Sequence, residues 1–194
     1  ARQSFQSAQL PEDIETGFTE RSNFGPVDAA TFPSGAHVCE VEIDLETGEV
    51  ALTRYCAVDD VGTMLNPLLC EGQIHGGIVQ GVGQALLENL VYDGESGQLV
   101  TGSFQDYCMP RADNFCAFEL AENSTPTDKN PLGVKGVGEA GTIGSIPAVM
   151  NAVNDALAAI GAPPVALPAT PEKLWRTIRR GKAFGGLAAG ANTG

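Results

Sequence analysis

The sequence of 194 residues lacks several features that would place it quickly in a class. No apolar stretch is long enough to span a bilayer, and residues 1–10 have neither the basic start nor the apolar run of a signal peptide. Basic residues are scarce: 11 Lys and Arg stand against 24 Asp and Glu, for a net charge of −13. Because nucleic acids and anionic membranes are negative surfaces, this balance argues against both as partners. We expect an acidic, soluble, cytoplasmic protein.

The Cys and His spacings that are typical of zinc and iron–sulfur sites are also missing. There is no CxxC pair, and the two histidines, His37 and His75, are isolated from each other and from the cysteines. This disfavours a zinc or iron–sulfur site within the chain, so we predict no metal ligands. The odd number of cysteines suggests reduced thiols, mostly in the core; they are Cys39, Cys56, Cys70, Cys108 and Cys116.

The chain does have the length and apolar content of one domain with appendages. Hydrophobic residues make up 43% and charged residues 18%, which is a globular composition. Residues 1–35 show no sustained period and are interpreted as an extended arm or linker. Residues 36–182 are interpreted as the domain, and 183–194 as a flexible tail. The chain does not begin with Met, which favours a processed piece or a fragment.

The hydrophobic periods predict an α+β fold. Residues 37–46 alternate apolar and acidic side chains, residues 47–48 form a turn, and residues 50–58 return as a second strand. Strands of this pattern and helices with one apolar face favour two layers, with hairpins of a mixed or antiparallel sheet packed against helices. Further elements are expected as a hairpin at 91–100, strands at 103–108 and 115–120, and helices at 71–90, 146–160 and from 170.

A glycine-rich stretch at residues 131–144 is the most unusual part of the chain. Gly133, Gly136, Gly138 and Gly141 fall within nine residues and bracket Lys135 and Glu139. Glycine costs chain entropy on ordering, so such a loop indicates close approach of backbone to another group or a strained turn. A helix is predicted directly after it, with Ser145 as the N-cap and Pro147 in the first turn. The loop would therefore deliver Glu139 to a helix N-terminus.

Two other interpretations of this stretch stay open. The glycines may only end one element before the next, with Glu139 complementing the helix dipole. The loop could also cradle a phosphate, but Lys135 is not followed by Ser or Thr, and a carboxylate would repel such a ligand. If the loop is a site, Glu139 is better suited to be a base.

The predicted helix at 71–90 has a face without charge. Gln73, Gln80 and Gln84 fall on one stripe close to Gly77, where an exposed helix normally carries Lys and Glu. Each interior glycine costs about 1 kcal/mol of helix propensity, so something must offset them. Close helix packing and contact with a ligand are equally good explanations; the glycines are Gly76, Gly77, Gly81 and Gly83.

Three segments together resemble the molybdenum hydroxylases, the xanthine dehydrogenase and aldehyde oxidase family. They are DDVGTMLNP at 59–67, EGQIHGGIVQGVGQAL at 71–86 and GVKGVGEAGTIGS at 133–145, in the family's order and separation. The resemblance is to the carboxyl-terminal part of the molybdopterin-binding large subunit. GEAGTIG followed by PAVMNAVNDAL most resembles the carbon monoxide dehydrogenase type.

The resemblance implies a molybdenum ion held by molybdopterin, in the cytosine dinucleotide form of bacterial members, with [2Fe-2S] and FAD on partner subunits or domains. Glu139 matches the family's active-site glutamate, which takes a proton from the hydroxyl on molybdenum. Gln73 matches a glutamine beside the cofactor. Further cofactor contacts are expected from Gln80, Gly136, Val137 and Gly138. For Lys135 we prefer a structural role.

The resemblance also implies partners. The family's large subunit is several times longer, so the remainder of that subunit, the iron–sulfur and flavin subunits and a small-molecule substrate are expected, and the isolated chain should be inactive. Ala140 and Gly141 stand where xanthine dehydrogenases place prolines, which disfavours a purine substrate. Two other functions stay open: a non-catalytic acidic interaction domain of a multi-subunit complex, and a small-anion binder at the Ser145 helix.

Overall fold

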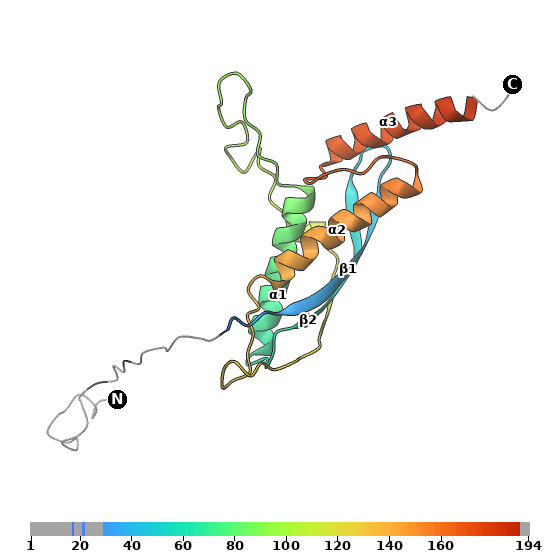
Figure 1. Ribbon diagram of the computed structural model, residues 1–194. Helices are drawn as coiled ribbons and strands as arrows, with labels where there is room; N and C mark the ends of the chain where they lie inside the picture. Colours follow the sequence, from blue (N-terminus) through green and yellow to red (C-terminus); the bar gives the residue numbers. More distant parts are fainter. Residues whose placement is uncertain (1–16, 18–20, 22–28, 191–194) are drawn as a thin grey trace, which may run out of the picture. The chain divides into compact units, whose positions relative to one another are not determined.

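The computed structural model describes Gly17, Arg21 and residues 29–190, with side chains described up to residue 181 (Figure 1). The chain divides into two units, residues 1–30 and 31–194, and the second contains every helix and strand of the described residues. Apart from Gly17 and Arg21, residues 1–28 of the expected arm lie outside the described part of the chain.

A mixed sheet of three strands lies at the centre of the second unit. Strand β1 (Ser34–Ile43) pairs antiparallel with β2 (Val50–Asp60), which pairs parallel with β3 (Phe118–Glu122). The predicted alternation in β1 is confirmed, because His37 and every second residue to Ile43 are half-buried while their neighbours are exposed. The turn between β1 and β2 is at Gly48, whose φ of 76° is left-handed and favours glycine.

A bulge adjusts which side chains of β2 face inward. Glu40 lies opposite Arg54 but Val41 lies opposite Leu52, so the register shifts between them. Leu52 is therefore followed on the buried face by Tyr55 rather than by residue 54. An extra residue in one strand has this effect because side chains alternate between the two faces.

Three α-helices complete the domain: α1 (Pro67–Leu86), α2 (Ala140–Ala159) and α3 (Pro171–Gly190). A short 3-10 helix, η3 (Ala112–Asn114), precedes β3. Helix α1 begins four residues before its predicted start, because the Asn66 side chain accepts from the Leu69 amide at 3.2 Å and Pro67 follows it. These are favoured residues for an N-cap and a first helical position.

One apolar core joins all three helices to the inner face of β2. The two-layer α+β prediction is thereby confirmed. Helix α3 contributes Leu174 and Ile178, as predicted, and includes residues 183–190 of the expected tail. The fully buried centre consists of Tyr55, Ile78, Val82, Ala85, Val149, Val153, Leu157, Ala169, Leu174 and Ile178.

Helix α2 begins at Ala140, six residues before its predicted start, so the Ser145 prediction is wrong. Ser145 is fully buried inside the helix, and Glu139 is the N-cap residue. Gly141 and Gly144 both lie inside the first two turns of this helix. Their cost in helix propensity is offset by packing, since no larger residue fits at either position. A small-anion site at a Ser145 helix end is therefore excluded.

The hairpin expected at 91–100 is confirmed, with an antiparallel bridge from Tyr92 to Leu99. Two smaller expectations are wrong. Residues 103–108 form turns rather than a strand, with the Tyr107 amide bonded to the Ser103 carbonyl at 2.8 Å. None of the five cysteines is fully buried, although all are free thiols. Cys39 comes closest to a core position, and burial raises the pKa of its thiol to about 11.

Candidate functional site

The loop that carries Glu139 is fixed to the end of β2. The Thr63 amide donates to the Gly133 carbonyl at 2.9 Å, and the Lys135 amide donates to the Val61 carbonyl at 2.9 Å. Gly62 and Gly133 both have φ of 68°, and a Cβ on Gly62 would collide with the Gly133 carbonyl. Glycine is needed at these two positions because the two backbones touch.

An ion pair reinforces this attachment. Lys135 Nζ lies 2.6 Å from Asp60 Oδ2, and the two side chains are 14% and 11% exposed. Asp60 Oδ1 accepts from the Gly62 and Thr125 amides, each at 2.9 Å. The hydrogen bond from Lys135, followed by those from the two amides, lowers the pKa of Asp60 to about 2. Lys135 therefore has the structural contacts that were expected of it.

On the other side of Glu139, the first turns of α2 are pressed against α1. A Cβ on Gly141 would collide with the Ile74 carbonyl, and a Cβ on Gly77 would lie 2.9 Å from the Thr142 amide nitrogen. One turn further, Gly81 leaves room for the Ser145 hydroxyl. Close helix packing is thus the explanation for Gly77 and Gly81.

His37 supports α2 from the sheet side. Its Nδ1 is 2.7 Å from the Tyr55 hydroxyl and its Nε2 is 3.3 Å from both carboxylate oxygens of Asp59. The His37 ring lies against Gly144, where a Cβ would be 2.5 Å from Nδ1. This buried network, together with the α1 contacts, sets the position of the start of α2.

Glu139 is exposed between these two fixed points. Its carboxylate makes no capping hydrogen bond, while its carbonyl accepts from the Ile143 amide at 3.0 Å. A Cβ on Gly136 or Gly138 would meet no atom within 4 Å. Neither glycine has a left-handed φ, so nothing in the described residues requires glycine there. Both leave backbone open to a group that approaches from outside.

The two predicted glutamines lie along α1 near this point. Gln80 Oε1 is 3.3 Å from the Thr142 hydroxyl, in the first turn of α2. Gln73 is exposed two turns earlier on the same stripe. Since Gly141 meets Ile74 and Ser145 meets Gly81, the two helices run in the same direction where they touch. Glu139 precedes this contact, as Gln73 does on α1.

The remaining glycines of α1 divide into two kinds. A Cβ on Gly83 would lie 2.9 Å from Pro110, so Gly83 serves packing as well. Gly76, and also Gly72, would meet nothing within 4 Å and are exposed. Val137 differs from the other predicted contact residues, because its side chain packs against the core. Its carbonyl accepts from the Ala140 amide at 3.3 Å, which leaves its amide as the group that a ligand could contact.

Sequence reasoning missed two residues that shape the site. Asp60 was assigned only to the end of a strand, and Thr142 to the glycine-rich loop. The usable signal for Asp60 was the single lysine of the glycine-rich stretch, Lys135, which needs an acidic partner. The second required knowing that α2 begins at Ala140. Among the residues with described positions, no group of three His, Cys, Asp or Glu could hold a metal ion.

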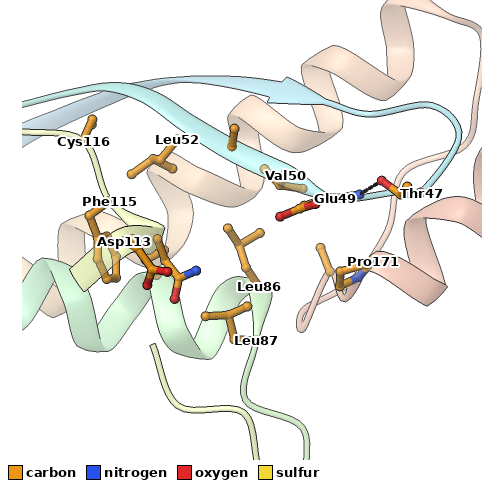
Figure 2. Close-up of a pocket in the computed structure, with 14 residues that line it drawn as sticks. Thr47, Glu49, Val50, Leu52, Leu86, Leu87, Asp113, Phe115, Cys116 and Pro171 are labelled. Carbon is orange, nitrogen blue, oxygen red and sulfur yellow. Dashed lines mark hydrogen bonds between the residues drawn. The ribbon is translucent and has the colours of Figure 1, made fainter. Parts of the chain in front are cut away.

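A well-formed cavity lies elsewhere in the domain. Figure 2 shows this space of about 390 Å³ between the β1–β2 turn, the end of α1 and residues 113–116. Glu49 and Asp113 lie at its edge, and Leu52 and Leu86 are among its apolar lining. None of the residues predicted for the site lines it.

In the part of the chain that is described, no helix is both long and apolar enough to cross a membrane.

Known proteins are similar to this chain over most of its length. A family described as "Molybdopterin cofactor-binding domain" matches residues 3–115. The large subunit of nicotine 6-hydroxylase from Paenarthrobacter nicotinovorans is 42% identical over 89% of this chain and 21% of its own length. The carbon monoxide dehydrogenase large chain of Afipia carboxidovorans is 36% identical, over 86% of this chain and 20% of its own.

A solved structure shows the same fold. Quinoline 2-oxidoreductase from Pseudomonas putida 86 superposes with a TM-score of 0.78 at 39% identity, over 90% of this chain and 22% of that one. The chain therefore belongs to the molybdopterin cofactor-binding domain family, among the molybdenum hydroxylases that the sequence resembles. It spans about a fifth of the length of the relatives it matches. The family match includes Gln73 and Gln80 but ends before Glu139.

Proposed function

We propose that this chain is the carboxyl-terminal portion of the large subunit of a molybdenum-cofactor-dependent oxidoreductase. The enzyme would be a hydroxylase or dehydrogenase of the carbon monoxide dehydrogenase or aldehyde and xanthine dehydrogenase type. This portion would supply Glu139 as the active-site base and part of the molybdopterin pocket. The observation that carries the proposal is the position of Glu139, which is exposed between two anchored segments and is preceded by Gly136 and Gly138, where a Cβ would meet no atom.

The open glycines fit a large, flat cofactor with many hydrogen-bonding groups. Gly136 and Gly138 are exposed loop residues with open space where a Cβ would lie. Gly72 and Gly76 leave such space on the surface of α1, although their own amides belong to the helix. The exposed amide side chains of Gln73 and Gln80 can both donate and accept hydrogen bonds. When bound, the molybdenum centre would supply a Lewis acid and an acceptor for the substrate's electrons.

Glu139 would accept the proton that the attacking oxygen loses. A general base must lie within hydrogen-bond reach of its proton, so its position matters as much as its chemistry. The two anchors provide that position. An anionic carboxylate is the form that can accept a proton.

The rest of the assembly is also proposed from the relatives. Their names describe large subunits and a subunit of a dehydrogenase complex, which supports partner subunits. As these partners we propose the remainder of the large subunit and iron–sulfur and flavin subunits. The cofactor would be the cytosine dinucleotide form of molybdopterin, with [2Fe-2S] and FAD on the partners. We propose a small-molecule substrate and a cytoplasmic location. The named substrates of relatives include nicotine and carbon monoxide, so the family alone does not select one.

Replacing Glu139 by Gln in the complete enzyme tests the proposal. A general base contributes about 10²–10⁴-fold, so kcat should fall by roughly that factor while molybdenum content and assembly stay unchanged. Glu95→Gln is a matched control, because Glu95 is an exposed acid in the turn at 93–97. If Glu139→Gln instead weakened assembly and left kcat per bound molybdenum unchanged, the chain would be the non-catalytic interaction domain.

A further inference from the structure

We propose that Asp60 and Lys135 form a positioning pair whose purpose is to hold Glu139 in place. This inference rests on the proposed function, since it assigns a role relative to the candidate base. Lys135 does not contact the reacting atoms in this proposal. It acts through the loop that it anchors.

Asp60 connects three segments that are far apart in the sequence. Its Oδ1 accepts from the Gly62 amide at the end of β2 and from the Thr125 amide after β3. Its Oδ2 receives Lys135 Nζ at 2.6 Å. Every one of these groups is a donor, so three hydrogen bonds to one carboxylate hold the segments together.

Lys135 makes the last side-chain hydrogen bond before Glu139, and between the two only the Val137 side chain packs against the core. Gly136 and Gly138 have no neighbouring atom where a Cβ would lie, whereas Gly141 is pressed against α1 two residues after Glu139. Glu139 is therefore preceded by a segment held through the Asp60–Lys135 pair, and it is followed by a segment held through packing against α1. Loss of the Asp60–Lys135 pair would leave residues 136–138 held mainly by the Val137 side chain, because the glycines on either side of it restrict the backbone least.

A lysine this close to a cofactor pocket could instead bind an anionic group of the cofactor or substrate. The geometry argues against this role. Its ammonium is at hydrogen-bond distance from a carboxylate and its side chain is only 14% exposed. Turning outward would leave the Asp60 carboxylate, 11% exposed, without its counter-ion. Removing one partner of a buried pair is more costly than removing both.

The test uses Lys135→Met, Asp60→Asn and the double variant in the complete enzyme. Each single variant should lower kcat by about tenfold or more, because displacement of a catalytic group by 1 Å can cost about 10²-fold. Molybdenum content and KM should stay within about twofold, because loss of an interaction that acts only in the transition state lowers kcat and kcat/KM equally. The double variant should lose less than the product of the two single losses, because the two residues are coupled.

A matched control is available on the open face of the sheet. Arg54 and Glu119 join β2 to β3 by a bidentate pair at 2.8 and 2.9 Å and are more than half exposed. Arg54→Met with Glu119→Gln removes an ion pair of the same kind away from the loop, and should change kcat by less than about twofold. Lys135→Arg should retain most of the wild-type kcat, because it keeps the charge.

Limited proteolysis supplies a readout that does not depend on activity. Cleavage at residues 136–138 should become faster in both single variants and remain at the wild-type rate in the Arg54 and Glu119 control. Loss of molybdenum from Lys135→Met but not from Asp60→Asn, or multiplicative losses in the double variant, would overturn the proposal and indicate direct anion binding. If Glu139→Gln kept full activity, the proposed function would fail first, whatever the Lys135 variants did.

Discussion

Two long connections of this domain, residues 131–139 and residues 88–110, have opposite relations to the core. The first, which carries Glu139, is fixed to β2 by backbone hydrogen bonds and the Asp60–Lys135 pair. The second, here called the 88–110 arm, extends away from α1 (Figure 1). It is closed at its base by a hydrogen bond of 2.5 Å from the Tyr107 hydroxyl to Glu88.

The arm is held by its own hydrogen bonds rather than by the core. Asp93 Oδ1 accepts from the Ser96 amide and hydroxyl at 2.8 and 2.6 Å. Yet Phe104 is 81% exposed and Tyr92 is 60% exposed. Concentrated exposed apolar area usually marks an interface. The comparison teaches that the domain itself positions the candidate base, whereas the arm presents apolar surface that the described chain leaves uncovered.

The largest expected effect concerns the isolated chain. Because the chain spans about a fifth of its relatives' length, we predict that it retains no molybdenum cofactor and turns over no substrate. Metal analysis and dye-reduction assays on the purified chain check this. Bound molybdenum together with activity would mean that the loop at 131–139 forms a working site without the remainder of the large subunit. The prediction would then be wrong.

The next largest effect is on the packing anchor of the loop. Gly141→Ala should lower the free energy of unfolding by about 1–3 kcal/mol, because its methyl group would be forced into α1. Gly76→Ala is the matched control: its methyl group would meet nothing, and the helix should gain up to about 1 kcal/mol. Urea unfolding of the two variants measures both. Equal effects would show that α1 and α2 do not touch as described.

Substitutions in the arm should have a smaller effect on stability. Phe104→Ser removes an exposed side chain, so the free energy of unfolding of the isolated chain should change by less than about 0.5 kcal/mol. Assembly with the rest of the subunit should weaken if the arm is an interface. Chemical unfolding and gel filtration of the coexpressed parts separate the two quantities. A large loss of stability would show that the arm is part of the core after all.

The smallest effect is a pH dependence that distinguishes Asp60. Its folded pKa of about 2 lies below its ordinary value of 3.8, so the stability it contributes is fully present above pH 4. That contribution is lost as pH falls through 2. The thermal midpoint of the wild type should therefore exceed that of Asp60→Asn by a constant amount from pH 5 to 7. The gap should close only between about pH 4 and 2, and an earlier closure would contradict the tight pair.

In the arm, hydrogen bonds from Ser96 and then from the Glu95 amide also lower the pKa of Asp93. Its contribution should likewise be lost only on acidification, but it should stabilise the arm alone. Amide hydrogen exchange of residues 93–98 in Asp93→Asn, compared with residues 131–135, measures that locality. Faster exchange in both segments would show that the arm and the anchored loop are coupled.

The family, the strands β1 and β2 and the apolar face of α3 could be predicted because each depends on residues close together in the sequence. Alternation identified β1 from His37 onward, and motif order identified the molybdenum hydroxylases. The start of α2 could not be predicted in the same way. Gly141 and Gly144 have low helix propensity, and only the backbone of α1 and the ring of His37 explain why glycine is required there.

Local pattern was thus sufficient to name Glu139, Gln73 and Gln80 as candidates, since their residue types and spacing carry the resemblance. Local pattern could not say which glycines are required for packing and which have free space around them, because the sequence shows the same residue in both cases. Folding separated them: Gly77 and Gly81 meet α2, while Gly136 and Gly138 meet nothing. The ion pair of Asp60 with Lys135 spans 75 positions, and contacts of that range exist only once the chain has closed on itself.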